Sequence, residues 1–133
     1  MSAIYLETSA FLRILFQESE YKKVEEKIKK SDFVVSSRLL KLEVERALIR
    51  YELDHPGHKI KVLNLKNELK NFWAKINFIE LTENICELAG RIASDVRLRS
   101  LDALHTATFF YLKEQHAAIE ILSFDSRIKS VIT

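Results

Sequence analysis

The chain has 133 residues, of which 47% are hydrophobic and 30% charged, and its formal net charge is +2, from 21 basic and 19 acidic residues. This length allows one domain with a sizeable core, the composition excludes a disordered tail, and the net charge is too small to indicate nucleic-acid binding by itself. Two glycines and one proline exclude a turn-rich β sandwich and a glycine-rich nucleotide loop. We therefore expect a single helix-rich domain over residues 1–133.

The first half of the chain alternates short apolar runs with amphipathic stretches. Residues 3–7 predict a buried strand, and Thr8 and Ser9 are expected to cap the helix that follows it. The other elements expected in this half are a helix over 10–16, a charged helix over 20–30, a strand over 33–36, and helices over 38–53 and 61–75. The breaker Pro56-Gly57 separates the last two helices.

The second half continues the alternation. Residues 77–81 predict a third strand, after which Thr82 is expected to cap a helix that runs to about residue 98. Ser100 is expected to cap a very apolar helix. The remaining elements are that helix over 101–114, a strand over 119–124, a short helix over 126–129 and a marginal fifth strand at 131–132.

Strands that alternate with helices predict parallel pairing, because parallel strands need crossover connections. The expected fold is therefore a three-layer α/β/α domain with a four- to five-stranded, mostly parallel sheet. Ligands of such sheets bind outside the carboxyl ends of the strands. Glu7 and Asp125 both follow predicted strands, so both are expected at that edge of the sheet.

Four acidic residues stand where a carboxylate is awkward for folding. Glu7 and Asp125 close apolar runs, Asp102 lies in the first turn of the apolar helix, and Glu43 lies on the margin of an apolar helical stripe. If the fold gathers these carboxylates, their mutual repulsion requires cations, and a Mg²⁺ or Mn²⁺ site is the expected result.

Each acid also has a purely structural explanation when it is considered alone. Glu7 and Asp125 can stabilise the first turn of the helices that follow them, and Asp102 gains from a helix dipole. Glu43 can pair with Arg46 or Arg50 on its own helix. His105 is expected to be a hydrogen-bonded core residue outside the active site, and Cys86 a buried, reduced thiol.

The sequence around these acids resembles the four signature blocks of PIN-domain ribonucleases, most closely the toxin members of VapBC toxin–antitoxin pairs. The most specific block is Leu101-Asp102-Ala103-Leu104-His105, and the blocks together span residues 5–10, 37–48, 98–107 and 122–127. One departure is present, because the family pattern has Asp at the position of Glu7. The longer side chain moves the carboxylate by about one bond length, which Mg²⁺ tolerates badly.

The resemblance implies a Mg²⁺- or Mn²⁺-dependent endoribonuclease that acts as the toxin of a type II pair. It implies that Glu7, Glu43, Asp102 and Asp125 hold one or two cations, with Glu7 and Asp102 as the best direct ligands. Residues expected to bind the substrate are Thr8, Ser9, Arg97 and Arg99. It also implies an RNA substrate, a small antitoxin partner and a homodimer. Two helices carry apolar faces that can serve such contacts or the core, one with Phe11, Leu12, Leu15 and Phe16 and the other with residues 63–73.

Two other functions are consistent with parts of the pattern. A receiver-like or phosphatase-like domain also uses strand-end acids for Mg²⁺, but the third predicted strand ends without a phospho-acceptor aspartate. A non-catalytic or weakened PIN-like module that binds RNA or protein fits the Glu7 departure. No leader pattern or run of about 18 apolar residues occurs, so we expect a cytoplasmic protein without a membrane span.

Overall fold

The structure, a computed structural model, describes residues 2–132. Its centre is a four-stranded sheet of order β3-β2-β1-β4, in which all three strand pairs are parallel. The strands are β1 (Ala3–Leu6), β2 (Phe33–Ser37), β3 (Asn77–Ile79) and β4 (Glu120–Leu122). In this register Tyr5 of β1 lies opposite Val35 of β2 and Ile121 of β4. The expected parallel α/β sheet is confirmed.

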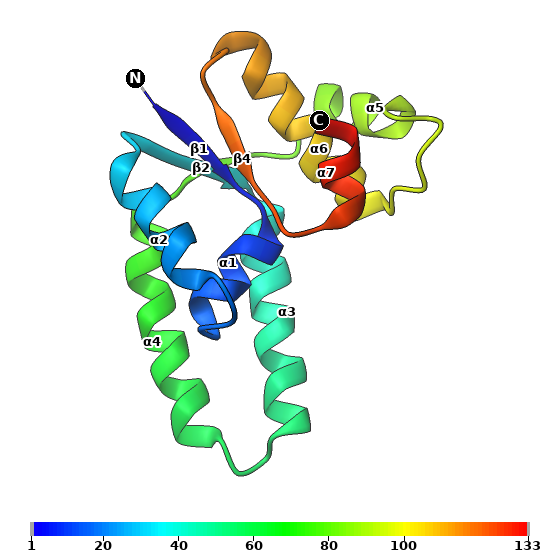
Figure 1. Ribbon diagram of the computed structural model, residues 1–133. Helices are drawn as coiled ribbons and strands as arrows, with labels where there is room; N and C mark the ends of the chain where they lie inside the picture. The colour runs from blue at the N-terminus through cyan, green and yellow to red at the C-terminus, as the bar shows by residue number, and fades with distance from the viewer. Residues whose placement is uncertain (1, 133) are drawn as a thin grey trace.

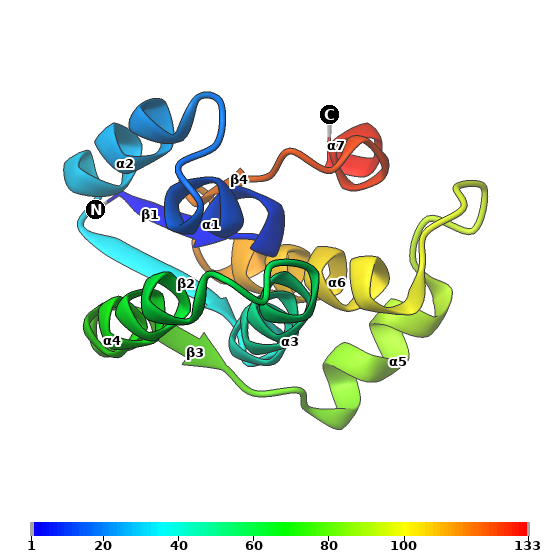
Figure 2. The same ribbon diagram turned by 90° about the horizontal axis from the view of Figure 1, so that it is seen from below.

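Helices connect the strands and flank the sheet (Figure 1). Their bounds are α1 (Thr8–Leu15), α2 (Tyr21–Lys30), α3 (Leu39–Asp54), α4 (Lys59–Lys75), α5 (Glu83–Arg91), α6 (Ser100–Gln115) and α7 (Ser126–Ile132). Helices α3 and α4 form a long hairpin that extends away from the sheet, whereas α5 and α6 lie together apart from α1 and α2 (Figure 2).

The alternation of side chains along β1 creates two cores, one on each face of the sheet. Ile4 and Leu6 belong to the larger core, which also includes Phe11 of α1, Val24 of α2 and several buried residues of α3 and α4. On the opposite face Tyr5 packs with Phe109 and Leu112 of α6 and with Ile119, the residue just before β4. The three-layer arrangement therefore follows from the strand period of two.

Several element boundaries differ from those expected. Helix α5 ends at Arg91 rather than near residue 98, because the backbone is extended at Ile92 and Ala93 has a positive φ of 48°. The fifth strand at 131–132 is wrong. Those residues belong to α7, where Ile128 is fully buried and Ile132, one helical turn later, packs against the second core.

The helix caps and the cysteine also need correction. Helix α1 begins at Thr8 with Glu7 as its N-cap, and α6 begins at Ser100 with Arg99 as its N-cap. The expected Thr82 cap is confirmed, because its hydroxyl accepts a hydrogen bond from the Ile85 amide at 3.3 Å. Cys86 is exposed rather than buried, since α5 buries the neighbouring Ile85 instead. Within residues 2–132, no helix is long and apolar enough to cross a membrane.

The parallel sheet brings the starts of several helices to one edge. Helix α1 follows β1 after Glu7, α3 follows β2 after Arg38, and α7 follows β4 within a few residues. The N-terminus of α6 reaches the same region, as the site residues below show. Helix N-termini carry partial positive charge, so this edge favours carboxylates and other anions.

Candidate functional site

All four acidic residues singled out in the sequence line one cavity of about 710 Å³ at this edge. Glu7 comes from the end of β1, Glu43 from α3, Asp102 from the first turn of α6 and Asp125 from the start of α7. The other residues that line it are Thr8, Ser9, Leu12, Leu42, Arg46, Arg50, Arg99 and Leu101. The fold therefore gathers carboxylates that are up to 118 positions apart (125 − 7) in the sequence.

Glu7 is the most buried of the four, with 5% of its surface exposed. Its Oε2 accepts a hydrogen bond from the Ser9 amide at 3.1 Å, which caps α1. Its Oε1 accepts hydrogen bonds from the hydroxyls of Ser9, at 2.5 Å, and Ser123, at 2.6 Å. The Ser9 oxygen in turn accepts from the Phe124 amide at 2.7 Å. Glu7 thus joins the end of β1 to the segment after β4 and keeps both oxygens engaged.

Glu43 is half-buried and is held by residues from two other elements. Its Oε1 accepts a hydrogen bond from the Thr8 hydroxyl at 2.7 Å and lies 2.5 Å from His105 Nε2. The pairing with Arg46 or Arg50 considered above is absent from the ion pairs of residues 2–132. Glu43 is therefore oriented from inside the fold rather than along its own helix.

His105 is a core residue, as expected, with 1% of its surface exposed. Its Nδ1 lies 2.7 Å from the Tyr5 hydroxyl, and its Nε2 lies 3.1 Å from the Thr8 hydroxyl as well as next to Glu43. Burial, with the charge of Glu7 as the second cause, raises the pKa of the Tyr5 phenol far above its ordinary range. The sequence identified this histidine as buried but gave no sign that it reaches a cavity carboxylate.

The two aspartates each stabilise a helix N-terminus. Asp102, at the third position of α6, accepts a hydrogen bond from the amide of the N-cap residue Arg99 at 3.3 Å, whereas Ser100 was expected to be the N-cap. Asp125 Oδ1 accepts from the amides of Arg127, at 2.9 Å, and Ile128, at 3.0 Å. Both side chains are half-buried and line the cavity, so capping and exposure to the cavity coexist at each of them.

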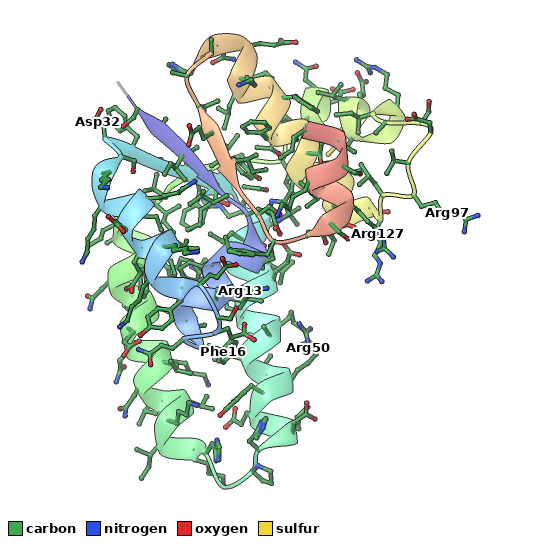
Figure 3. The ribbon with its side chains drawn as sticks, viewed as in Figure 1. Arg13, Phe16, Asp32, Arg50, Arg97 and Arg127 are labelled. Atoms are coloured by element: carbon green, nitrogen blue, oxygen red, sulfur yellow. The ribbon has the colours of Figure 1, made fainter. Side chains whose placement is uncertain are left out.

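Three exposed arginines line the same cavity. Arg46 and Arg50 lie four residues apart on α3, on the face that also carries Glu43, and Arg99 precedes α6. Arg99 was expected near the site, whereas the sequence suggested Arg46 and Arg50 only as ion-pair partners for Glu43. Figure 3 shows Arg50 projecting from α3. Arg97 is exposed on the segment between α5 and α6 and is not among the residues that line the cavity.

The lining suits a hard divalent cation, because the side-chain oxygens it offers come from four carboxylates and from the hydroxyls of Thr8 and Ser9. Within residues 2–132, no three Asp, Glu, His or Cys side chains stand close enough to form a ready-made metal cluster. Mg²⁺ usually keeps several waters and takes only one or two protein carboxylates, so a wide, acid-lined cavity fits that mode of binding. The residues therefore fit Mg²⁺ or Mn²⁺ held largely through water.

Comparisons with known proteins show what the chain resembles in sequence and in fold. The family model described as PIN domain matches residues 4–132. Ribonuclease VapC45 and Ribonuclease VapC49, from two strains of Mycobacterium tuberculosis, are each 30% identical to the chain over 108 residues, which cover 81% of this chain and 75% of the relative. Ribonuclease VapC46 from the same species is 29% identical over a stretch of the same length.

Two solved structures share the fold. A toxin–antitoxin complex from Klebsiella pneumoniae superposes with a TM-score of 0.68 at 15% identity, covering 97% of this chain and 92% of that one. VapBC2 from Rickettsia felis, bound to a DNA fragment from its promoter, gives a TM-score of 0.66 at 12% identity, covering 98% and 93%. At these identities the structures support the three-layer fold alone.

Proposed function

The chain belongs to the PIN-domain family, and from that premise we propose that it is a Mg²⁺- or Mn²⁺-dependent endoribonuclease, the toxin of a type II toxin–antitoxin pair. The observation that carries the proposal is the gathering of Glu7, Glu43, Asp102 and Asp125 around one cavity. Relatives named ribonuclease, at 30% identity, support RNA as the substrate.

The four carboxylates would hold the cation, Asp102 and Glu7 as direct ligands and Glu43 and Asp125 directly or through water. When bound, such a cation neutralises charge on the phosphodiester and promotes ionisation of the attacking water. The hydroxyl of Thr8 donates a hydrogen bond to Glu43, and the hydroxyl of Ser9 donates one to Glu7. In this proposal both hydroxyls therefore orient carboxylates rather than bind the phosphate of the substrate. This division of roles leaves the arginines to bind the substrate.

Arg46, Arg50 and Arg99 would hold the phosphates that flank the cleaved bond. Each is exposed, lines the cavity and makes no side-chain ion pair within residues 2–132. A guanidinium binds a phosphate with two parallel hydrogen bonds, and contacts to the backbone position RNA without reading its sequence. Arg97 remains a candidate for more distant phosphates.

A weakened or non-catalytic PIN-like module is the second candidate function. The observation that favours it is the engagement of both Glu7 oxygens by Ser9 and Ser123, which compete with a cation for the same lone pairs. In that case the chain would bind RNA or protein at the same cavity without cutting RNA efficiently.

We also propose a small antitoxin as partner, a homodimer and a cytoplasmic location, in keeping with the relatives named VapC and the toxin–antitoxin neighbours. Among the apolar residues considered for such contacts, Phe11 and Leu15 are buried in the core and Leu12 and Phe16 are half-buried. Leu63 on α4 is 58% exposed, so the outer face of α4 remains available to a partner.

The test compares cleavage of single-stranded RNA in MgCl₂ by the parent chain and by Asp102→Asn. Asparagine keeps an oxygen that can accept from the Arg99 amide, so the helix cap survives while the charge is lost. Asp95→Asn, which changes an exposed aspartate outside the cavity, is the matched control. Cleavage by the parent and the control but not by Asp102→Asn supports the nuclease, and equal cleavage by all three contradicts it.

A further inference from the structure

A buried chain of hydrogen bonds runs from the core to the cavity and is not explained by the proposed chemistry. It joins the Tyr5 hydroxyl to His105 Nδ1 at 2.7 Å, and His105 Nε2 to Glu43 Oε1 at 2.5 Å. Tyr5 is 0% and His105 1% exposed, whereas 23% of the Glu43 side chain is exposed. The chain of hydrogen bonds therefore links two fully buried polar side chains to one carboxylate of the candidate site.

We propose that His105 is a positioning residue that fixes the Glu43 carboxylate for divalent-cation binding. This inference rests on the proposed function, because it assigns Glu43 to the cation. Oε1 accepts hydrogen bonds from both Thr8 and His105, and Oε2 has no hydrogen-bond partner within residues 2–132. The contacts to Oε1 hold the carboxylate in one rotamer and leave Oε2 for the cavity.

The hydrogen-bond donors and acceptors along the chain fix one tautomer of the histidine. An ionised carboxylate only accepts hydrogen bonds, so His105 must carry a proton on Nε2 to donate to Glu43 Oε1. In the neutral imidazole Nδ1 is then an acceptor, and the Tyr5 hydroxyl donates to it. Tyr5 thus holds His105 in the Nε2–H form that Glu43 requires.

Groups that orient a metal-binding carboxylate contribute to affinity without touching the metal. Loss of such a group typically lowers metal affinity by about 10- to 100-fold. A purely structural role for His105 predicts instead that its loss destabilises the fold and leaves the affinity of the folded protein unchanged. These two outcomes can be separated by measuring cation affinity and stability on the same variants.

The experiment titrates Mn²⁺ into the full chain by calorimetry, with electron paramagnetic resonance as a second readout of free Mn²⁺. His105→Gln places an amide near the position of Nε2 and can still donate to Glu43, whereas His105→Asn ends near Nδ1 and cannot reach it. We expect His105→Asn to bind Mn²⁺ about 10- to 100-fold more weakly than the parent, and His105→Gln to stay within a few-fold of it.

Two further variants keep the test decisive. Leu112→Ala creates a cavity in the core that contains Tyr5, and Leu112 is not a hydrogen-bond partner of Glu43. This variant should lower stability and leave the Mn²⁺ affinity unchanged. Tyr5→Phe removes the donor to Nδ1 with little change in volume. It should populate the Nδ1–H tautomer in ¹⁵N NMR spectra and weaken Mn²⁺ binding, which decides the question if His105→Asn does not fold.

The outcomes distinguish this inference from the proposed function. A parent chain that binds no Mn²⁺ overturns both. A parent that binds Mn²⁺, with His105→Asn or Tyr5→Phe binding it equally well, overturns the positioning role alone. Loss in His105→Asn with retention in His105→Gln supports it.

Discussion

The Ser123 hydroxyl donates a hydrogen bond to Glu7 Oε1 at 2.6 Å, which joins two residues 116 positions apart. Ser123 follows β4 and Glu7 follows β1, and these strands are neighbours in the sheet. The contact therefore links the ends of two neighbouring strands beside the cavity. It also engages a carboxylate oxygen that a cation would otherwise bind. It gives a structural reason to expect weaker cation binding by Glu7 than by the aspartate of the family pattern.

Glu7→Asp shortens this side chain by one methylene and should draw the carboxylate away from Ser123. We expect the Mg²⁺ concentration that supports half-maximal RNA cleavage to fall by about tenfold, equal to ~1.4 kcal/mol of binding free energy. Mg²⁺ titration of the cleavage rate measures this change. An unchanged or higher Mg²⁺ requirement would show that the longer side chain does not limit the site.

Much of this site follows from the strand pattern of the sequence. Glu7 and Asp125 follow apolar runs, and parallel strands end at one edge, so their meeting in one cavity could be predicted. The contact between Glu43 and His105 could not, because it depends on the rotation of α3 and α6 about their axes and joins residues 62 positions apart. Helical periodicity describes one helix and not its rotation against another.

The limits of the boundary predictions have similar causes. Gly90 lies in the last turn of α5, but a lone glycine is tolerated inside a helical pattern, so the sequence did not fix the helix end. The helix ends where the backbone becomes extended at Ile92 and takes a positive φ at Ala93. At the end of the chain, a short apolar pair fits a strand and a helix equally well. Ile128 and Ile132 are four residues apart, which favours a helix once the core against which they pack is known.

Arg46→Gln and Arg50→Gln should weaken RNA binding without changing the fold, because both side chains are exposed. Each should reduce the magnitude of the slope of log affinity against log salt by about 0.7, the value for one phosphate contact on a single strand. Fluorescence anisotropy with labelled RNA, in an Asp102→Asn background to prevent cleavage, measures the slope. Arg91→Gln, an exposed arginine outside the cavity, is the control, and an equal slope in all three variants would contradict the role.

Tyr5 should make the protein sensitive to alkaline pH. Its pKa is raised in the folded state, mainly by burial, so above about pH 10 the unfolded chain loses a proton that the folded chain retains. The free energy of unfolding should therefore fall as the pH rises through that range. Urea denaturation at pH 8 to about 11 should show a smaller decline for Tyr5→Phe than for the parent or for Tyr111→Phe, which changes an exposed tyrosine. An identical decline in the parent and in Tyr5→Phe would contradict the raised pKa of Tyr5 in the folded state.

The most direct test of the central claim is anomalous diffraction from crystals of the chain grown or soaked with MnCl₂. The account predicts a Mn²⁺ peak inside the cavity lined by Glu7, Glu43, Asp102 and Asp125, with an oxygen of Asp102 among its ligands. A cavity that stays free of Mn²⁺ while the cation binds elsewhere or not at all, in a protein folded as described, would contradict it.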